Sequence, residues 1–448
     1  MSDQKLDTTR RKIAGLMPEI RTNIERLIRI PSVSFPEFDP KQVRRSAEAT
    51  EDILRGCGME TRLLEVEGAH PAVLGRIPAP DRAPTVLLYA HHDVQPQGPE
   101  DLWFSPPFEP VERNGRLYGR GSSDDKAGIV MHAAALRAWE GRPPVGVTVF
   151  VEGEEESSSE HLGAFLSKYG DLLRADAVIL ADSGNWRTGE PALTISLRGI
   201  VACFVEIRTL DHAVHSGEYG GAIPDALTTL CRTLATLHDE KGNVAVPGLA
   251  SGPADPLDLT EDELREWAGV RPGVELIGEG NLTERMWTKP AISVLGIDAP
   301  RTPEASNQLV PFARAKVSMR IPPGQDAEEA MSALVKHLES NVPWGAEVNI
   351  VREGVGSPFT LEAEGAAYGA MRRAMSEAFE KEPVLMGAGG SIPFVAEFAK
   401  QFPKATLMLT GAGDPKCNAH SEDESVDLGD LEKSCLAEAL FLGYLAEG

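Results

Sequence analysis

Cysteine is scarce in this chain, which has five among 448 residues. Their number is odd, their spacing is wide and no Cys-x-x-Cys motif occurs, so neither a disulfide framework nor a thiolate zinc site is indicated. A reducing, cytoplasmic compartment fits this usage best. The five residues are Cys57, Cys203, Cys231, Cys417 and Cys435.

Basic residues and long apolar runs are also few. Lys and Arg number 44 against 68 Asp and Glu, a formal charge of −24 at pH 7, which argues against nucleic acid or an anionic membrane as a partner. No stretch is apolar for long enough to span a bilayer, and residues 1–20 lack the apolar core of a signal peptide. Because 42% of the residues are hydrophobic, we expect a soluble enzyme with two packed domains.

What the sequence does contain is a set of four short apolar runs, each followed by acidic residues or histidine. The runs cover residues 86–90, 147–151, 178–181 and 405–409. Such runs are typical of buried parallel strands, and ligands bind at the carboxyl ends of strands in open α/β sheets. A metal site is therefore predicted among the residues that follow them, namely His91, Asp93, Glu152 to Glu156, Asp182 and His420.

The order of the segments predicts an α/β fold with an insertion. Helical and strand-like segments alternate up to Arg198, which favours a mixed, mostly parallel sheet covered by helices. Between residues 199 and 353, alternating strands and amphipathic helices indicate a compact α+β domain. We therefore predict a catalytic domain formed by residues 1–198 and 354–448, with residues 199–353 inserted. Within the insertion, residues 247–290 have no clear assignment.

His91 and Asp93 lie two positions apart at the end of a predicted strand, so both side chains can point the same way. A carboxylate beside a ligating imidazole fixes its tautomer and raises its basicity, which would make His91 a metal ligand oriented by Asp93. Taken alone, this motif is equally consistent with a turn that caps the next segment.

Two further acidic motifs are ambiguous by themselves. The loop from Gly119 to Lys126 places Asp124 and Asp125 before a helix, where carboxylates would repel phosphate but could serve as ordinary N-caps. The acids from Glu152 to Glu156 follow a buried strand, where one glutamate can bind metal while its neighbour acts as a general base. A solvated acidic helix start is the alternative.

Asp182 and His420 carry little weight singly, because a lone Asp after a strand is usually a turn residue and a lone loop His is usually a surface residue. Together, two histidines and three carboxylates form a donor set suited to zinc, cobalt or manganese with positions left open for water. The five predicted ligands are His91, Asp124, Glu156, Asp182 and His420.

Taken together, these motifs resemble those of a known family, the dinuclear zinc metallopeptidases. These include carnosine-type dipeptidases, glutamate carboxypeptidases, acetylornithine deacetylases and succinyl-diaminopimelate desuccinylases. The similarity covers nearly the whole chain. It rests on residues 89–96, 119–126, 152–159, 181–183, 215–221, 389–393 and 419–421.

The resemblance implies a zinc-exopeptidase-like fold and two divalent metal ions, with zinc expected and cobalt or manganese as alternatives. One ion would be held by His91 and Asp182, the other by Glu156 and His420, and Asp124 would bridge them. Glu155 would be the general base that takes a proton from the bridging water. Asp93 would support the centre, and the peptide bond between Asp124 and Asp125 is expected to be cis.

The resemblance also implies that the inserted domain is a lid and the interface of a homodimer. His215 would reach the site of the partner subunit and stabilise the oxyanion. Arg320, Ser391 and Asn307 correspond to positions that hold the carboxylate of a substrate. The sequence around Gln308 departs from the small hydroxyl residue that many relatives have there.

Three functions are compared. Hydrolysis of dipeptides or short peptides ranks first, because residues 92–96, the Arg198 junction and the long 247–290 segment resemble the dipeptidase branch. The alternative enzyme is an N-acyl amino acid deacylase, either a deacetylase or a desuccinylase, that uses the same site. A metal-dependent binding protein without turnover is disfavoured, because such a protein has no need for the proton shuttle that Glu155 would provide.

Overall fold

The computed structural model describes residues 3–390 and 392–447. Within these residues the chain forms two compact units, one of residues 3–195, 361–386 and 392–447, the other of residues 196–360 and 387–390. Each unit has its own hydrophobic core. None of the helices in the described chain combines the length and the apolarity that crossing a bilayer requires.

The main sheet has the strand order β1-β2-β6-β3-β7-β17-β8-β15, and β16 also pairs with β8. Its centre is parallel, because β3 runs parallel to β6 and β7, and β7 runs parallel to β17. These four strands coincide with the four apolar runs, so the predicted mostly parallel α/β sheet is confirmed. The strands are β1 (Glu60–Leu64), β2 (Ala72–Ile77), β3 (Thr85–His91), β6 (Gly146–Glu152), β7 (Ala177–Leu180), β8 (Ala192–Leu197), β15 (Phe359–Thr360), β16 (Val384–Ala388) and β17 (Thr406–Leu409).

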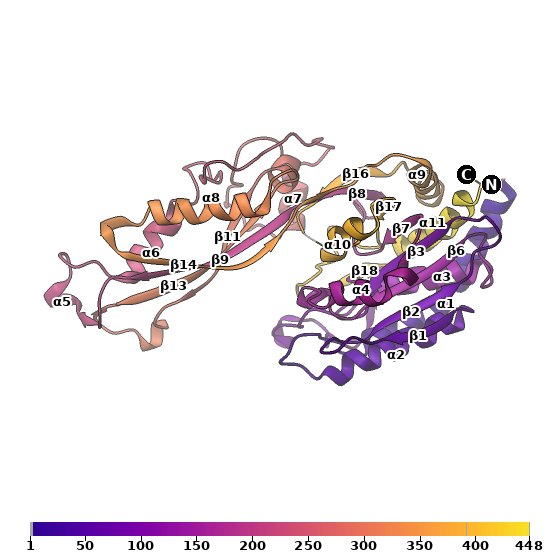
Figure 1. Ribbon diagram of the computed structural model, residues 1–448, viewed down its shortest axis with the longest axis horizontal. Coiled ribbons are helices and arrows are strands. Elements are labelled where there is room, and N and C mark those ends of the chain that lie inside the picture. The colour runs from indigo at the N-terminus through magenta and orange to yellow at the C-terminus, as the bar shows by residue number, and fades with distance from the viewer. Residues whose placement is uncertain (1–2, 391, 448) are drawn as a thin grey trace. The chain divides into compact units, whose positions relative to one another are not determined.

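Helices cover both faces of this sheet, as Figure 1 shows. Val86, Leu88 and Ala90 of β3 share one buried cluster with five helices: α1 (Asp3–Ile28), α2 (Pro40–Gly56), α3 (Lys126–Ala138), α9 (Ala366–Phe379) and α11 (Leu428–Leu445). Tyr89 alternates to the other face, where its ring stacks 4.0 Å from that of Phe394. That face carries α4 (Leu162–Leu173) and α10 (Pro393–Gln401).

The start of α3 follows from its local sequence. Asp125 has a non-helical backbone and accepts a hydrogen bond from the Gly128 amide at 3.1 Å, as an N-cap residue does. The N-cap interpretation of the acid pair therefore holds for Asp125. Asp124, one residue earlier, does not cap the helix. The peptide bond between the two is cis, as the family resemblance implies.

A small three-stranded sheet of order β18-β5-β4 also belongs to the first unit. It pairs β18 (Ser425–Asp427) with β5 (Arg116–Tyr118), which in turn pairs with β4 (Val111–Arg113). The chain that leaves β5 leads to the Asp124 loop, and the chain that enters β18 comes from the His420 loop. The remaining short turns of this unit are η1 (Glu100–Leu102) and η2 (Glu155–Ser157).

The second unit contains a four-stranded antiparallel sheet of order β11-β13-β9-β14. Its buried residues, such as Val205 and Val317, share a cluster with Leu230 and Leu334 of two helices, α6 (Ala226–Ala235) and α8 (Ala327–Ser340). The sheet consists of β9 (Gly199–Arg208), β11 (Ala291–Asp298), β13 (Phe312–Ile321) and β14 (Glu347–Gly356). The alternating strands and amphipathic helices of the sequence thus form an α+β unit.

Smaller elements complete the second unit. A two-residue ladder pairs β10 (Val214–His215) with β12 (Gln308–Leu309), and β10 leads into α5 (Ser216–Tyr219). The unassigned segment 247–290 is mostly irregular, with α7 (Glu261–Trp267) and a π-helical turn, η3 (Glu284–Thr288). A capping box between Thr260 and Glu263 starts α7. The other short turns are η4 (Thr302–Glu304) and η5 (Pro343–Gly345).

Candidate metal centre

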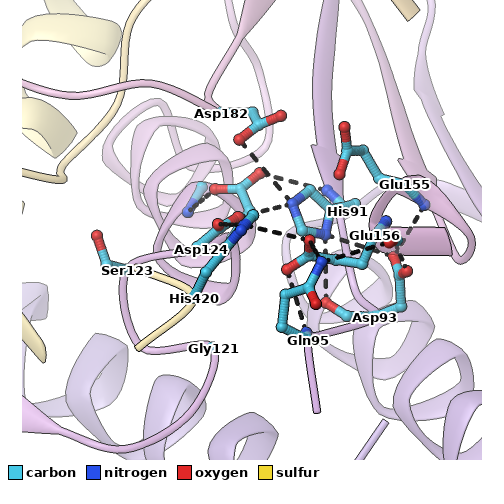
Figure 2. Close-up of polar contacts among 12 residues, drawn as sticks. His91, Asp93, Gln95, Gly121, Ser123, Asp124, Glu155, Glu156, Asp182 and His420 are labelled. Atoms are coloured by element: carbon cyan, nitrogen blue, oxygen red, sulfur yellow. Dashed lines mark hydrogen bonds and ion pairs between the residues drawn. The ribbon is translucent and has the colours of Figure 1, made fainter. Parts of the chain in front are cut away.

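The predicted ligands come from segments that are far apart in the sequence and adjacent in the sheet. His91 ends β3, Glu156 lies in η2 after β6, and Asp182 follows β7. His420 lies in the loop after β17, and Asp124 precedes α3. Because β6, β3, β7 and β17 are parallel neighbours, their carboxyl ends meet at one edge. The structure therefore brings all five residues together, as Figure 2 shows.

The five side chains form two overlapping groups that could each hold a metal ion. The first is His91, Asp124 and Asp182, and the second is Asp124, Glu156 and His420; within each, the candidate ligand atoms lie within 4.8 Å of one another. Asp124 belongs to both groups. Its Oδ1 lies 3.0 Å from His91 Nε2 and its Oδ2 lies 2.9 Å from His420 Nε2. One carboxylate thus joins the two groups.

The crowded carboxylates of the centre favour the binding of cations. Burial raises the pKa of Asp182 and of Glu155 well above the usual values, and the charges of neighbouring carboxylates, Asp124 and Asp182 respectively, add to the effect. Hydrogen bonds to Asp124 and then to Glu156 raise the pKa of His420 to about 11. Crowded buried acids of this kind are stable when divalent cations neutralise them. The donor set of imidazole nitrogens and carboxylate oxygens fits zinc, cobalt or manganese.

Asp93 connects His91 to the acidic turn. Its Oδ1 lies 3.4 Å from His91 Nδ1, opposite the ring nitrogen that faces Asp124. The same carboxylate accepts the backbone amides of Glu155 at 3.3 Å and Glu156 at 3.1 Å. Asp93 therefore links the His91 ring to the start of η2, and it belongs to neither candidate ligand group.

Two polar residues near the centre carry no predicted role in the sequence. The Gln95 side chain donates from Nε2 to Glu156 Oε2 at 2.8 Å, and its backbone amide donates to Glu156 Oε1 at 3.1 Å. Ser34 donates its hydroxyl to Asp93 Oδ2 at 2.7 Å. Gln95 lies in the motif that follows β3, which was a usable signal. Ser34 is remote in sequence, so only the fold could reveal its contact.

The remaining predicted residues belong to the second unit. His215 is exposed at the end of β10, where its Nδ1 accepts the Gly217 amide at 3.0 Å. Asn307 lies beside it, because its carbonyl accepts the Ser216 amide at 3.0 Å. Arg320 lies on β13 opposite Ile200 of β9. Ser391 lies outside the described residues.

Arg198, which had no predicted site role, is a half-buried cation in the second unit. Its Nε and Nη1 are buried without a hydrogen-bond partner among the described residues. Burial lowers the pKa of Arg198 to about 10, and the positive charge of Arg320 adds to this shift. A Cβ at Gly389 would lie 2.8 Å from Arg198 Nη2, so glycine lets that turn approach the guanidinium. The positive charge of Arg320 therefore acts on a partly buried guanidinium, and a bound anion would offset the free-energy cost of burying it.

His92, next to the predicted ligand, makes stability depend on pH. It is fully buried, and burial lowers its pKa from the usual 6.5 to about 4. His92 takes up a proton near pH 6.5 in the unfolded chain but only near pH 4 in the folded chain. The contribution of neutral His92 to the unfolding free energy is therefore complete above pH 6.5 and is lost as the pH falls toward 4. The loss is on the order of 3 kcal/mol.

We expect His92→Gln to remove that part of the acid sensitivity. In urea unfolding at pH 7.5 and pH 4.5, the decrease in unfolding free energy should be smaller in the variant than in the parent. The exposed His212, changed to Gln, is the control and should leave the decrease unchanged. An equal decrease in His92→Gln and parent would contradict the assignment.

The fold and the centre define a class of protein, an α/β protein in which two groups of carboxylates and imidazoles at the sheet edge could hold metal ions. Comparison with known proteins agrees. A model described as peptidase family M20/M25/M40 matches residues 87–442. A cysteinylglycine-S-conjugate dipeptidase of Corynebacterium striatum is 35% identical over 437 residues, which cover 94% of this chain and 95% of the relative.

Two further matches extend over at least 96% of each chain. A Cys-Gly metallodipeptidase of Candida albicans is 28% identical and covers 96% of both chains. The solved structure of a dipeptidase from Saccharomyces cerevisiae has a TM-score of 0.87 at 24% identity and covers 100% of both chains, which supports the fold. This chain therefore belongs to peptidase family M20/M25/M40 and is a hydrolase, and the resemblance to the dipeptidase branch is confirmed. Membership of a metallopeptidase family implies divalent metal ions.

Proposed function

We propose that this protein is a dinuclear metal-dependent dipeptidase. The observation that carries the proposal is the pair of candidate ligand groups that share Asp124, with the half-buried acid Glu155 beside them. Both reported relatives are dipeptidases, which supports dipeptides as the substrate class. We expect zinc as the metal, with cobalt or manganese as alternatives, and a cytoplasmic location.

In this proposal the ligands divide as the resemblance implies. His91 and Asp182 would hold one ion, Glu156 and His420 would hold the other, and Asp124 would contribute to both. The ions would supply Lewis-acid polarisation of the peptide carbonyl and lower the pKa of the attacking water. Side chains of the protein carry out the other steps of the reaction.

Glu155 acts as the general base. It accepts a proton from the attacking water and delivers that proton to the nitrogen of the leaving amine. Its burial and the charge of Asp182 raise its pKa above the usual value, which is the direction that favours a general base near neutral pH. Asp93 fixes the backbone of Glu155 through the hydrogen bond to its amide.

We further propose that residues 199–353 form a lid and a homodimer interface. In that arrangement His215 reaches the centre of the partner subunit and donates a hydrogen bond to the developing oxyanion. The exposure of His215, whose Nδ1 already accepts the Gly217 amide, leaves Nε2 for this contact. Residues 1–198 and 354–448 would then form the catalytic domain.

The carboxylate of the substrate is assigned to the second unit. Arg320 and Ser391 would bind it, with Asn307 nearby. Arg198, whose Nε and Nη1 have no hydrogen-bond partner among the described residues, would add a second guanidinium. Charge-assisted hydrogen bonds to a carboxylate contribute about 1.5–3 kcal/mol each, so a free carboxylate is expected to be a strong requirement.

A substrate panel tests this function. With zinc-loaded protein, we expect Cys-Gly and other dipeptides to be cleaved, and the same dipeptides carrying a carboxyl-terminal amide to show a KM about 10–100-fold higher, because they lack the anion that Arg320 binds. N-acetyl and N-succinyl amino acids form the third arm of the panel. Activity confined to that arm would establish the deacylase alternative and refute the dipeptidase.

A further inference from the structure

Glu424 is a fully buried carboxylate four residues after His420, and the proposed chemistry does not use it. Its Oε1 accepts the backbone amides of Ser123 at 2.9 Å and Asp124 at 3.1 Å. Its Oε2 accepts the Gly121 amide at 2.9 Å and Arg120 Nη1 at 2.8 Å. All four side-chain bonds therefore end on the loop that carries Asp124.

The backbone adds a fifth bond between the same segments. The Gly119 amide donates to the Glu424 carbonyl at 2.9 Å, directly beyond the pairing of Ser425 with Tyr118. The Asp124 loop and the His420 loop are thus joined at one residue. Since Asp124 lies between His91 and His420, a small shift of this loop would change both candidate ligand groups.

We propose that Glu424 is a positioning residue that sets the location of Asp124 relative to His420 and so determines metal affinity. The inference rests on the proposed metal centre. Among the described residues, the hydrogen bonds of the Glu424 carboxylate go to the backbone of Gly121, Ser123 and Asp124 and to the side chain of Arg120, so Glu424 acts through the backbone of Asp124.

The proposed positioning role depends on both the negative charge and the shape of the Glu424 side chain. Every partner of the Glu424 carboxylate is a donor, and the Arg120 guanidinium makes one of these bonds an ion pair. An amide in place of the carboxylate would turn one oxygen into a donor that faces two other donors. Glutamine is nearly isosteric with glutamate, so Glu424→Gln tests the bonds with little change in packing. Substitution of groups that orient metal ligands typically costs about 10–100-fold in metal affinity or activity.

The control is a buried carboxylate of the same unit with a different task. Glu438 of α11 is also buried and lies 2.9 Å from His132 Nδ1 of α3, a hydrogen bond between two helices. Glu438→Gln removes one buried charge and its hydrogen bonds, as Glu424→Gln does. A purely structural role for Glu424 predicts the same behaviour for both variants.

The experiment measures the affinity of the metal-free proteins for Zn²⁺ by competition with a chromophoric chelator, together with kcat, KM and the thermal midpoint of the metal-free form. We expect Glu424→Gln to weaken the affinity for Zn²⁺ about 10–100-fold, to lower kcat at limiting Zn²⁺ and to recover part of it at saturating Zn²⁺. KM for dipeptides should stay near the parent value. Glu438→Gln should keep the parent affinity even where its thermal midpoint falls.

Parent-like affinity for Zn²⁺ in Glu424→Gln would overturn the proposal, as would equal losses in both variants. If Glu424→Gln does not fold, Glu424→Asp decides the question, because it keeps the charge but shortens the side chain by one methylene; unchanged affinity in that variant would also overturn the proposal. Because binding of Zn²⁺ is measured without substrate, a failure of the dipeptidase assignment would appear as absent turnover in the parent and would leave this test intact.

Discussion

Glu155→Gln is expected to lower kcat about 10²–10⁴-fold while the metal content stays that of the parent. The range is the usual contribution of a positioned general acid or base. Glutamine has the shape of glutamate but cannot accept the proton of the attacking water, and Glu155 is not a member of either candidate ligand group. The measurement is kcat on a dipeptide together with metal analysis of the same preparation.

The adjacent residue provides a matched control. Glu154 is also buried, but its carboxylate accepts the His70 amide at 2.7 Å and lies 2.9 Å from His161 Nδ1. Glu154→Gln should therefore keep most of the parent kcat. Parent-like turnover in Glu155→Gln would remove the proposed base, and equal losses in the two variants would show that the effect belongs to the acidic turn as a whole.

Asp124→Asn is the second substitution that we expect to have a large effect, because Asp124 belongs to both candidate ligand groups. We expect loss of both metal ions and a fall of kcat by at least about 10³-fold, since several kcal/mol of transition-state stabilisation disappear with the ions. Asp182→Asn and His420→Ala each affect a single group, so each should weaken one ion and leave the other.

Metal titrations of the three variants separate these outcomes. The exposed Asp211, changed to Asn, is the control for loss of one acidic charge. If Asp124→Asn lost only one ion, or bound two as the parent does, the shared position of Asp124 would not reflect a shared role. A chelator should reproduce the loss of activity in the parent, and added Zn²⁺ should restore it.

The sequence predicted much of the first unit because its signals are local. The apolar runs that became β3, β6, β7 and β17 need only a period and a length to be recognised, and the end of each run identifies the side chains at the sheet edge. Asp182 and His420 are weak signals as single residues. They indicated a metal site because both follow strands that were predicted to end at the same edge. Segment 247–290 had no comparable signal, and most of it is irregular.

Contacts between remote segments escaped prediction. In the sequence, Glu424 resembles any other member of a solvated acidic run. Nothing nearby in the sequence shows that its carboxylate accepts four hydrogen bonds from residues 120–124. Arg198 likewise gives no signal beyond its place at the domain junction, and only the structure shows that its Nε and Nη1 are buried with no hydrogen-bond partner among the described residues.

By itself the sequence determined the class of fold, the candidate ligands and the type of chemistry, because periodicity and donor identity are written in neighbouring residues. Only the tertiary structure decided that one carboxylate, Asp124, lies between two histidines from opposite ends of the chain, and that Asp125 beside it caps a helix. The physical reason is that distance and orientation between remote residues arise from sheet order and loop packing, which no local pattern encodes.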